Sequence, residues 1–174
     1  FVIFSDISVL RATEERMKRL VNYDSLTGLP NRSLFNQLLE QTLAGAKRDK
    51  DYGALLIIDL CRFTSVNDTL GHDVGDELLR QFAQRLSRSL REQDILARLG
   101  GDQFAVALVR LHKREHSGLV ADKLLATLNT PFIIDAHALH IGASIGIAVY
   151  PEDGTDAMAL YRNAEVALKG TQQT

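Results

Sequence analysis

The run Ala54-Leu55-Leu56-Ile57-Ile58 constrains the fold most, because it is a short, unbroken apolar stretch that ends in a carboxylate, Asp59. Continuous rather than alternating hydrophobicity is typical of a strand buried on both faces. We therefore predict a central strand over residues 53–60, with Asp59 at its C-terminal tip. The rest of the chain must cover both faces of that strand.

The flanking segments alternate between helical and extended patterns. We predict helices from about residue 34 onward and over residues 74–90, 118–128 and 156–168, with a polar loop between Asp59 and the second helix. Further strands are predicted at residues 95–99, 104–109, 132–134 and 139–150, with Gly100 and Gly101 as the hairpin turn between the first two. This order predicts an α/β fold, an α+β sandwich in which helices flank a mostly antiparallel sheet of the split βαβ or palm type.

The N-terminal residues differ from this pattern. Phe1-Val2-Ile3-Phe4 reads as a strand, and the chain starts without Met, so residues 1–8 are predicted to end an upstream domain. Residues 9–22 are predicted to form a linker helix, whose apolar positions fit either a short coiled-coil seam or packing on the same domain. Residues 23–174 then form the main domain.

Size and composition set broad limits. A length of 174 residues is that of one domain, and a formal charge of −2 gives no electrostatic reason to expect nucleic acid or a membrane surface as a partner. Cys61 is the only cysteine, so an intrachain disulfide is impossible and a reducing, cytoplasmic compartment is expected, although a domain of this kind can also belong to a membrane-tethered protein.

Two carboxylates occupy positions suited to metal chemistry. Asp59 ends the central strand and Asp102 lies in the tight hairpin, so the two converge if their strands are neighbours. Paired carboxylates at adjacent strand tips hold Mg²⁺ in polymerase-like palms, where the metal activates a hydroxyl and neutralises phosphates. The alternative is that both aspartates simply cap loops.

Four ordered motifs add to this pattern: residues 24–32, the stretch Asn67-Asp68-Thr69-Leu70-Gly71-His72-Asp73-Val74-Gly75-Asp76, the signature Arg98-Leu99-Gly100-Gly101-Asp102-Gln103-Phe104, and residues 144–151. Together they make residues 23 to about 170 resemble a GGDEF domain, the diguanylate cyclase module of cyclic di-GMP signalling. The resemblance implies a palm or nucleotidyl-cyclase-like sheet and a dimer in which the 3′-hydroxyl of one GTP attacks the α-phosphate of the other.

The resemblance also implies roles for individual residues. Asp59, Asp102 and the backbone carbonyl of Leu60 would be ligands of Mg²⁺ or Mn²⁺, and Asp102 would lie nearest the reacting hydroxyl. Asn67 and Asp76 would read the guanine edge, because an amide and a carboxylate together satisfy its O6, N1 and N2 groups. The nucleotide would also contact Phe63, Gly100 and Gly101. The competing interpretation of Asn67 and Asp76 is a turn residue and a helix cap.

A second constellation, Arg91-Glu92-Gln93-Asp94, matches the Arg-x-x-Asp inhibitory site of the family, which binds cyclic di-GMP. Arg91 would bind guanine or phosphate bidentately, and Asp94 would accept from the guanine N1 and N2 groups. Arg and Asp three residues apart also form ordinary surface ion pairs.

The departures from the family cluster at the active site. Gln103 replaces an acid of the signature, Thr64 and Gln172 replace phosphate-binding lysines, and Cys61 replaces an aspartate. Lys169, one turn before Gln172, is a candidate to compensate. Each charged hydrogen bond lost from a phosphate costs roughly 1.5–3 kcal/mol, or about tenfold or more in binding or rate.

Three functions remain open at this point. The preferred one is a regulatory module that binds GTP, cyclic di-GMP or both, with weakened or absent cyclase activity. The alternatives are an active diguanylate cyclase and a non-binding dimerisation module. Residues 1–8 and the charged helix after them resemble the end of a PAS sensor domain, and degenerate GGDEF domains are commonly followed by an EAL phosphodiesterase domain, so both are expected as neighbours.

Overall fold

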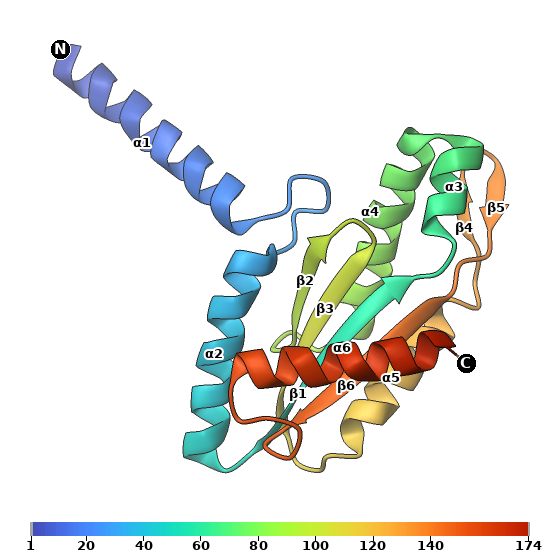
Figure 1. The fold of residues 1–174 in the computed structure, drawn as a ribbon. Coiled ribbons are helices and arrows are strands. Elements are labelled where there is room, and N and C mark those ends of the chain that lie inside the picture. Colours follow the sequence, from blue (N-terminus) through green and yellow to red (C-terminus); the bar gives the residue numbers. More distant parts are fainter. Residues whose placement is uncertain (1, 174) are drawn as a thin grey trace.

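The computed structural model describes residues 2–173 of the chain, and side chains within residues 9–17 and 21–171. Its elements alternate along the chain as expected (Figure 1). In order they are α1 (Val2–Asn22), α2 (Arg32–Asp49), β1 (Tyr52–Leu60), α3 (Phe63–Leu70), α4 (His72–Ser89), β2 (Ile95–Gly100), β3 (Gln103–Leu111), α5 (His116–Thr127), β4 (Phe132–Ile134), β5 (His137–Leu139), β6 (Ala143–Tyr150) and α6 (Ala157–Gln173).

The main sheet has four strands in the order β2-β3-β1-β6, and every neighbouring pair is antiparallel. The strand β1 lies at its centre, paired with β3 on one side and β6 on the other, as its continuous apolar run predicted. The expected sandwich with a mostly antiparallel sheet is therefore confirmed. A separate hairpin, β4-β5, lies beyond the end of the main sheet.

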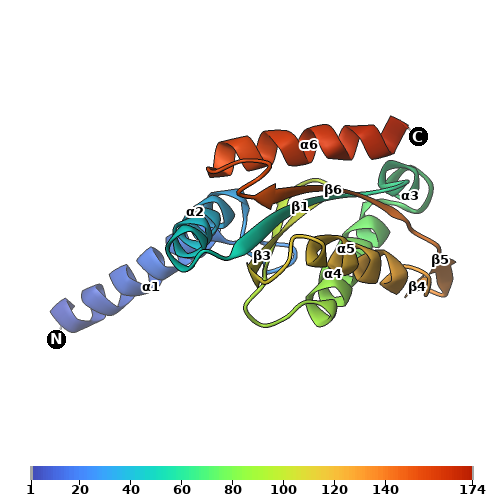
Figure 2. The same ribbon diagram turned by 90° about the horizontal axis from the view of Figure 1, so that it is seen from below.

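The two faces of the sheet carry two separate cores. On one face, Leu55 and Ile57 of β1 pack against buried residues of α2 and α6, including Phe35 and Leu160. On the other face, alternate β1 residues such as Leu56 pack against α3, α4 and α5. Figure 2 shows α6 on one side of the sheet and α4 and α5 on the other. The strict alternation of side chains along a strand produces this division.

The helix α6 lies very close to β6. A Cβ atom at Gly146 would lie 2.1 Å from the Ala164 carbonyl oxygen and 2.5 Å from the Leu168 nitrogen. Only a residue without a side chain permits this approach. The contact brings the C-terminal half of α6 over the sheet edge at which β1 ends.

Three local predictions were wrong: a strand at residues 1–4, a loop after Asp59 and a single strand at residues 139–150. The expected strand at residues 1–4 is helical from Val2 onward, because no Gly or Pro interrupts residues 2–22; Phe1 lies outside the described residues. Assignment of residues 1–8 to an upstream domain stays a prediction. The expected polar loop after Asp59 contains α3, whose apolar positions Phe63, Val66 and Leu70 follow helical spacing among polar residues.

The expected strand at residues 139–150 is divided into β5 and β6. One part pairs with β4 and the other with β1, so a single straight strand cannot serve both sheets. Residues 140–142 form the break between them.

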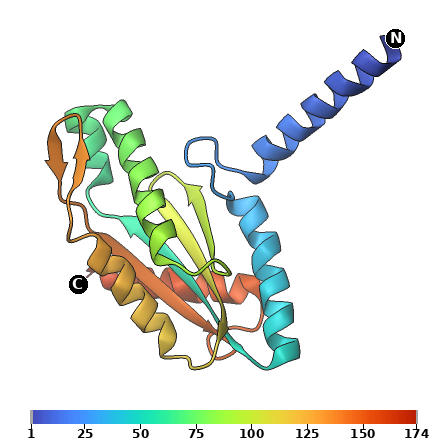
Figure 3. The ribbon, with the colours of Figure 1, turned by 180° about the vertical axis from the view of Figure 1, so that it is seen from behind.

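The helix α1 projects away from the body of the domain (Figure 3). Its apolar side chains Val9, Leu10, Met17 and Val21 are 58–65% exposed. Of the helices within residues 2–173, none has the length and apolar character needed to cross a bilayer.

Candidate functional site

The candidate site lies at the tip of β1, where strand register aligns three polar side chains. Asp59 lies opposite Gln103 of β3 and opposite Ser144 of β6. Directly paired residues of antiparallel strands share a face, so all three lie on the α6 face. The backbone N–H of Leu60 donates to the Asp102 carbonyl at 3.2 Å. The structure thus brings Asp59 and Asp102 to one sheet edge.

The electrostatics of Asp102 reflect this convergence. Burial and the nearby charge of Asp59 raise the pKa of the Asp102 carboxyl, and these effects outweigh a backbone hydrogen bond and the charge of Arg98, which lower it. Two carboxylates that repel one another are a donor set suited to a cation. Among the described side chains, no three His, Cys, Asp or Glu residues are grouped to hold a metal ion, so further ligands would come from the backbone carbonyl of Leu60, a nucleotide and water.

The residues that depart from the family surround this edge. Gln103 faces Asp59 directly. Cys61 is exposed, with its Sγ 3.8 Å from Ser144 Oγ, and Thr64 is exposed on α3. Lys169 is exposed on α6; Gln172 belongs to the same helix, but its side chain lies outside the described set.

The glycines between β2 and β3 form the predicted hairpin. Gly100 has φ of 140° and Gly101 has φ of 51°, a backbone region that favours glycine. The Gly101 carbonyl accepts hydrogen bonds from Arg98 Nε at 3.1 Å and Nη2 at 2.8 Å. The guanidinium therefore fixes the peptide immediately before Asp102.

The predicted guanine readers lie on two adjoining helices. Asn67 is on α3 and Asp76 follows Gly75 in α4, and both side chains are half-buried. The Asn67 Oδ1 atom is buried with no hydrogen-bond partner and lies over Gly75, where a Cβ would be 1.8 Å away. Phe63 borders the same glycine. No local pattern indicated that Gly75 makes room for the Asn67 side chain.

The two residues of the predicted inhibitory site, Arg91 and Asp94, form an ion pair with each other. Arg91 Nη2 donates to Asp94 Oδ1 at 3.0 Å, and Arg91 Nε donates to Oδ2 at 3.2 Å. The same guanidinium donates to the Val109 carbonyl at 2.7 Å. The Asp94 side chain is 2% exposed, whereas that of Arg91 is 44% exposed. Arg91 is thus the accessible member of the pair.

One pairing in the site was not predicted. Arg98 Nη1 donates to both carboxylate oxygens of Asp24, at 3.0 and 3.2 Å, across 74 residues of sequence. Thr27 donates to the same carboxylate through its N–H and its hydroxyl. Burial alone would raise the pKa of Asp24, but the Thr27 hydrogen bonds and the Arg98 charge lower it overall. Both residues stood in recognised motifs, but no local pattern joins them.

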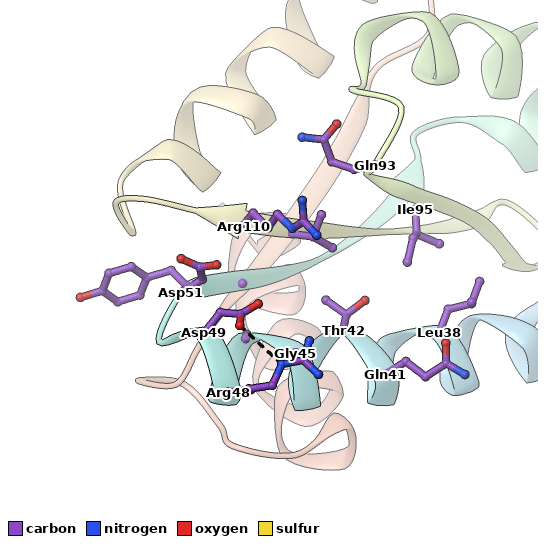
Figure 4. Close-up of a pocket in the computed structure, with 14 residues that line it drawn as sticks. Leu38, Gln41, Thr42, Gly45, Arg48, Asp49, Asp51, Gln93, Ile95 and Arg110 are labelled. Carbon is purple, nitrogen blue, oxygen red and sulfur yellow. Dashed lines mark hydrogen bonds and ion pairs between the residues drawn. The ribbon is translucent and has the colours of Figure 1, made fainter.

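A cleft of about 390 Å³ lies at the other end of the sheet, between α2 and the start of β1 (Figure 4). Polar residues from several elements line it, among them Thr42, Asp51, Gln93 and Arg110. It is remote from the tip of β1 and includes none of the predicted site residues.

Comparison with known proteins identifies a family. The family profile described as diguanylate cyclase, GGDEF domain, matches residues 21–174. The bifunctional diguanylate cyclase/cyclic di-GMP phosphodiesterase MucR of Pseudomonas aeruginosa is 42% identical over 161 residues, which are 92% of this chain and 23% of MucR. The diguanylate cyclase TpbB of the same species is 40% identical over 148 residues, covering 84% of this chain and 34% of TpbB. The chain therefore spans about a quarter of the length of MucR and about a third of that of TpbB.

Solved structures agree with this similarity. The GGDEF domain of TpbB, also called YfiN, superposes with a TM-score of 0.85 at 39% identity, covering 87% of this chain and 90% of that one. The GGDEF domain of DgcB from Caulobacter crescentus, solved with cyclic di-GMP, has a TM-score of 0.79 at 25% identity and covers 87% of this chain and 90% of that one.

Proposed function

Because the chain belongs to the GGDEF domain family of cyclic di-GMP signalling, we propose that it is a regulatory nucleotide-binding domain with weakened or absent diguanylate cyclase activity. The single observation that carries the proposal is the strand tip, where Asp59 and Asp102 converge while Gln103 faces Asp59. The two carboxylates that would bind a metal are retained there, and the acidic side chain that the family has at position 103 is missing.

Asp59, Asp102 and the Leu60 carbonyl would hold Mg²⁺ or Mn²⁺. Mg²⁺ in nucleotide enzymes typically binds one or two carboxylates together with phosphates and water, which fits a site with only two carboxylates. When bound, the metal would neutralise phosphate charge and lower the pKa of an attacking hydroxyl. The two aspartates would position that metal relative to the hairpin, whose glycines permit close approach of a phosphate.

Asn67 and Asp76 would select guanine, with Phe63 beside them. A buried acceptor without a donor costs about 1–3 kcal/mol, and a guanine N–H would satisfy Asn67 Oδ1 once the amide turns outward. The Asp76 carboxylate would accept from the remaining guanine N–H groups.

Turnover is expected to be weak because Thr64, Gln172 and Gln103 remove charge from the phosphate and metal sites. If two lost lysine contacts add, they reduce binding or rate by about 10² to 10⁴. An active cyclase would require Lys169 or another cationic group to replace the missing lysines at the phosphate site.

Cyclic di-GMP is the second proposed ligand, at Arg91 and Asp94. The DgcB domain was solved with this nucleotide, and Arg91 exposes its guanidinium in a similar fold. Binding would require Arg91 to exchange some of its contacts with Asp94 and Val109 for contacts with guanine or phosphate.

The expected partners follow the same reasoning. The exposed apolar side chains of α1 favour a homodimer of the longer protein, and the bifunctional relative supports an adjacent phosphodiesterase domain. The PAS-like assignment of residues 1–8 remains part of this proposal.

Calorimetric titration with GTP and cyclic di-GMP, beside a turnover assay with Mg²⁺, tests the proposal. Asn67→Ala should abolish GTP binding alone, and Arg91→Ala cyclic di-GMP binding alone. Gln41→Ala, at an exposed position of α2, is the control. Turnover at typical enzyme rates would establish the active cyclase instead, and no binding of either nucleotide would leave the interaction module.

A further inference from the structure

A chain of contacts runs from the end of α1 to the signature hairpin. Its centre is the Arg98 guanidinium, which binds the Asp24 carboxylate on one side and the Gly101 carbonyl on the other. The Arg98 backbone N–H also donates to the Pro30 carbonyl at 3.0 Å. The side chains of Arg98 and Asp24 are only 14% and 17% exposed, so solvent screens this pair less than a surface pair.

The segment that holds Asp24 is itself bonded to the last turn of α1. The Asn31 side-chain amide donates to the Val21 carbonyl at 2.6 Å, and the Asn31 backbone N–H donates to the Asn22 carbonyl at 2.9 Å. Tyr23 and Pro30 form a β-bridge in the same turn. Asn31 also caps α2, accepting from the Leu34 N–H at 3.1 Å. One side chain therefore joins the end of α1 to the start of α2.

We propose that Arg98 and Asp24 are positioning residues that couple the exit of α1 to the geometry of the hairpin bearing Asp102. Arg98 fixes the carbonyl of the residue before Asp102, and Asp24 fixes Arg98. A change in the angle of α1 displaces the 24–31 turn, and the planar guanidinium transmits that displacement as a rigid fork. The free energy of coupling appears as a change in affinity at the metal-binding edge.

This inference can be tested by two measurements, and it rests on the proposed function only for the second, the affinity of the domain for metal and nucleotide. The first readout, the order of the hairpin without nucleotide, depends on the contacts alone. The two can therefore fail separately.

The first experiment removes the pair. In Asp24→Asn and Arg98→Lys, amide hydrogen exchange at residues 101–103 of the nucleotide-free chain should accelerate about tenfold, as expected when a charged hydrogen bond is lost. Affinity for GTP with Mn²⁺ should fall about 10- to 100-fold, the usual effect of losing a group that orients a metal ligand. Arg98→Lys keeps the charge and loses the fork, so it separates geometry from electrostatics.

Glu152→Gln is the matched control, because Glu152 forms another long-range ion pair, with Arg114, but at the surface. It should alter neither readout. Unchanged exchange at β1 amides confirms that a variant is folded. Hairpin exchange equal to that of wild type in both Asp24→Asn and Arg98→Lys would overturn the proposal, whether or not the wild type binds GTP.

The second experiment tests the link to α1. Asn31→Ser keeps a side-chain oxygen to cap α2, since Ser caps about as well as Asn, but is too short to reach the Val21 carbonyl. It should shift the hairpin amide resonances in the wild-type background and shift them less than half as much in Asp24→Asn. Equal shifts in both backgrounds, or none in either, would show that the hairpin does not respond to α1 through this pair.

Discussion

Restoring the missing acid in Gln103→Glu should make the folding stability of the domain depend strongly on metal. Gln103 lies directly opposite Asp59, so the new carboxylate would face an existing one. Cβ atoms of such pairs lie about 4.5–5.5 Å apart, which places the charges about 6 Å apart. At an effective dielectric constant of about 20–80, their repulsion is about 0.7–2.8 kcal/mol.

Without metal, the variant should therefore unfold at a temperature about 1–11 °C lower than the wild type, given the usual 2–4 °C per kcal/mol for a chain of this length. With Mn²⁺ and GTP the sign should reverse, because a third carboxylate beside the cation raises affinity about 10- to 100-fold. Thermal unfolding followed by circular dichroism, with and without Mn²⁺ and GTP, measures both effects. Isothermal titration gives the affinity directly.

Gln41→Glu is the matched control, because it adds the same charge at an exposed position of α2. Its free energy of unfolding should differ from that of the wild type by no more than about 0.5 kcal/mol, both with and without Mn²⁺ and GTP. An equal loss of stability with and without metal in Gln103→Glu, or affinity for Mn²⁺ and GTP no higher than that of the wild type, would contradict a metal site beside residue 103.

Three further substitutions test other parts of the structure. Burial and a neighbouring charge raise the pKa of Asp102 above 3.8, so ionisation of this carboxyl lowers the stability of the folded domain above about pH 4. Asp102→Asn should therefore raise the melting temperature near pH 7 and leave it unchanged near pH 3. A lower melting temperature near pH 7 would contradict this. Gly146→Ala forces a Cβ against the α6 backbone at 2.1 Å and should cost about 1–3 kcal/mol in urea unfolding, with an unchanged midpoint arguing against the close contact. Gly75→Ala displaces the Asn67 amide and should weaken GTP binding about tenfold. The control Gly45→Ala, whose Cβ would have no contact closer than 3.8 Å, should leave binding unchanged. Equal affinities in the two variants would show that Gly75 does not contribute to the nucleotide site.

The sequence was sufficient to predict the elements with strong local signals. The run that ends at Asp59 could be placed at the centre of the sheet because a short stretch that is apolar at every position is typical of a strand buried on both faces. Gly100 and Gly101 marked their hairpin because both adopt positive φ. Convergence of Asp59 and Asp102 followed once those two strands were neighbours.

Other features depend on tertiary partners that no local pattern reveals. The helix α3 was missed because its few apolar residues lie among polar ones, and one buried side chain, Val66, anchors it. The division between β5 and β6 reflects pairing with different strands. The contact of Arg98 with Asp24 joins residues 74 positions apart, and a single sequence carries no information about such a pair.

The division of the sheet into two cores has a consequence for how such a domain changes over time. The buried residues of both cores lie along the strands and helices, whereas Cys61 and Thr64 are exposed at the tip. Exposed substitutions generally alter stability by no more than about 0.5 kcal/mol. Substitutions at such exposed positions can therefore accumulate at little cost to folding, and a domain of this architecture can lose chemistry at the tip and keep its fold.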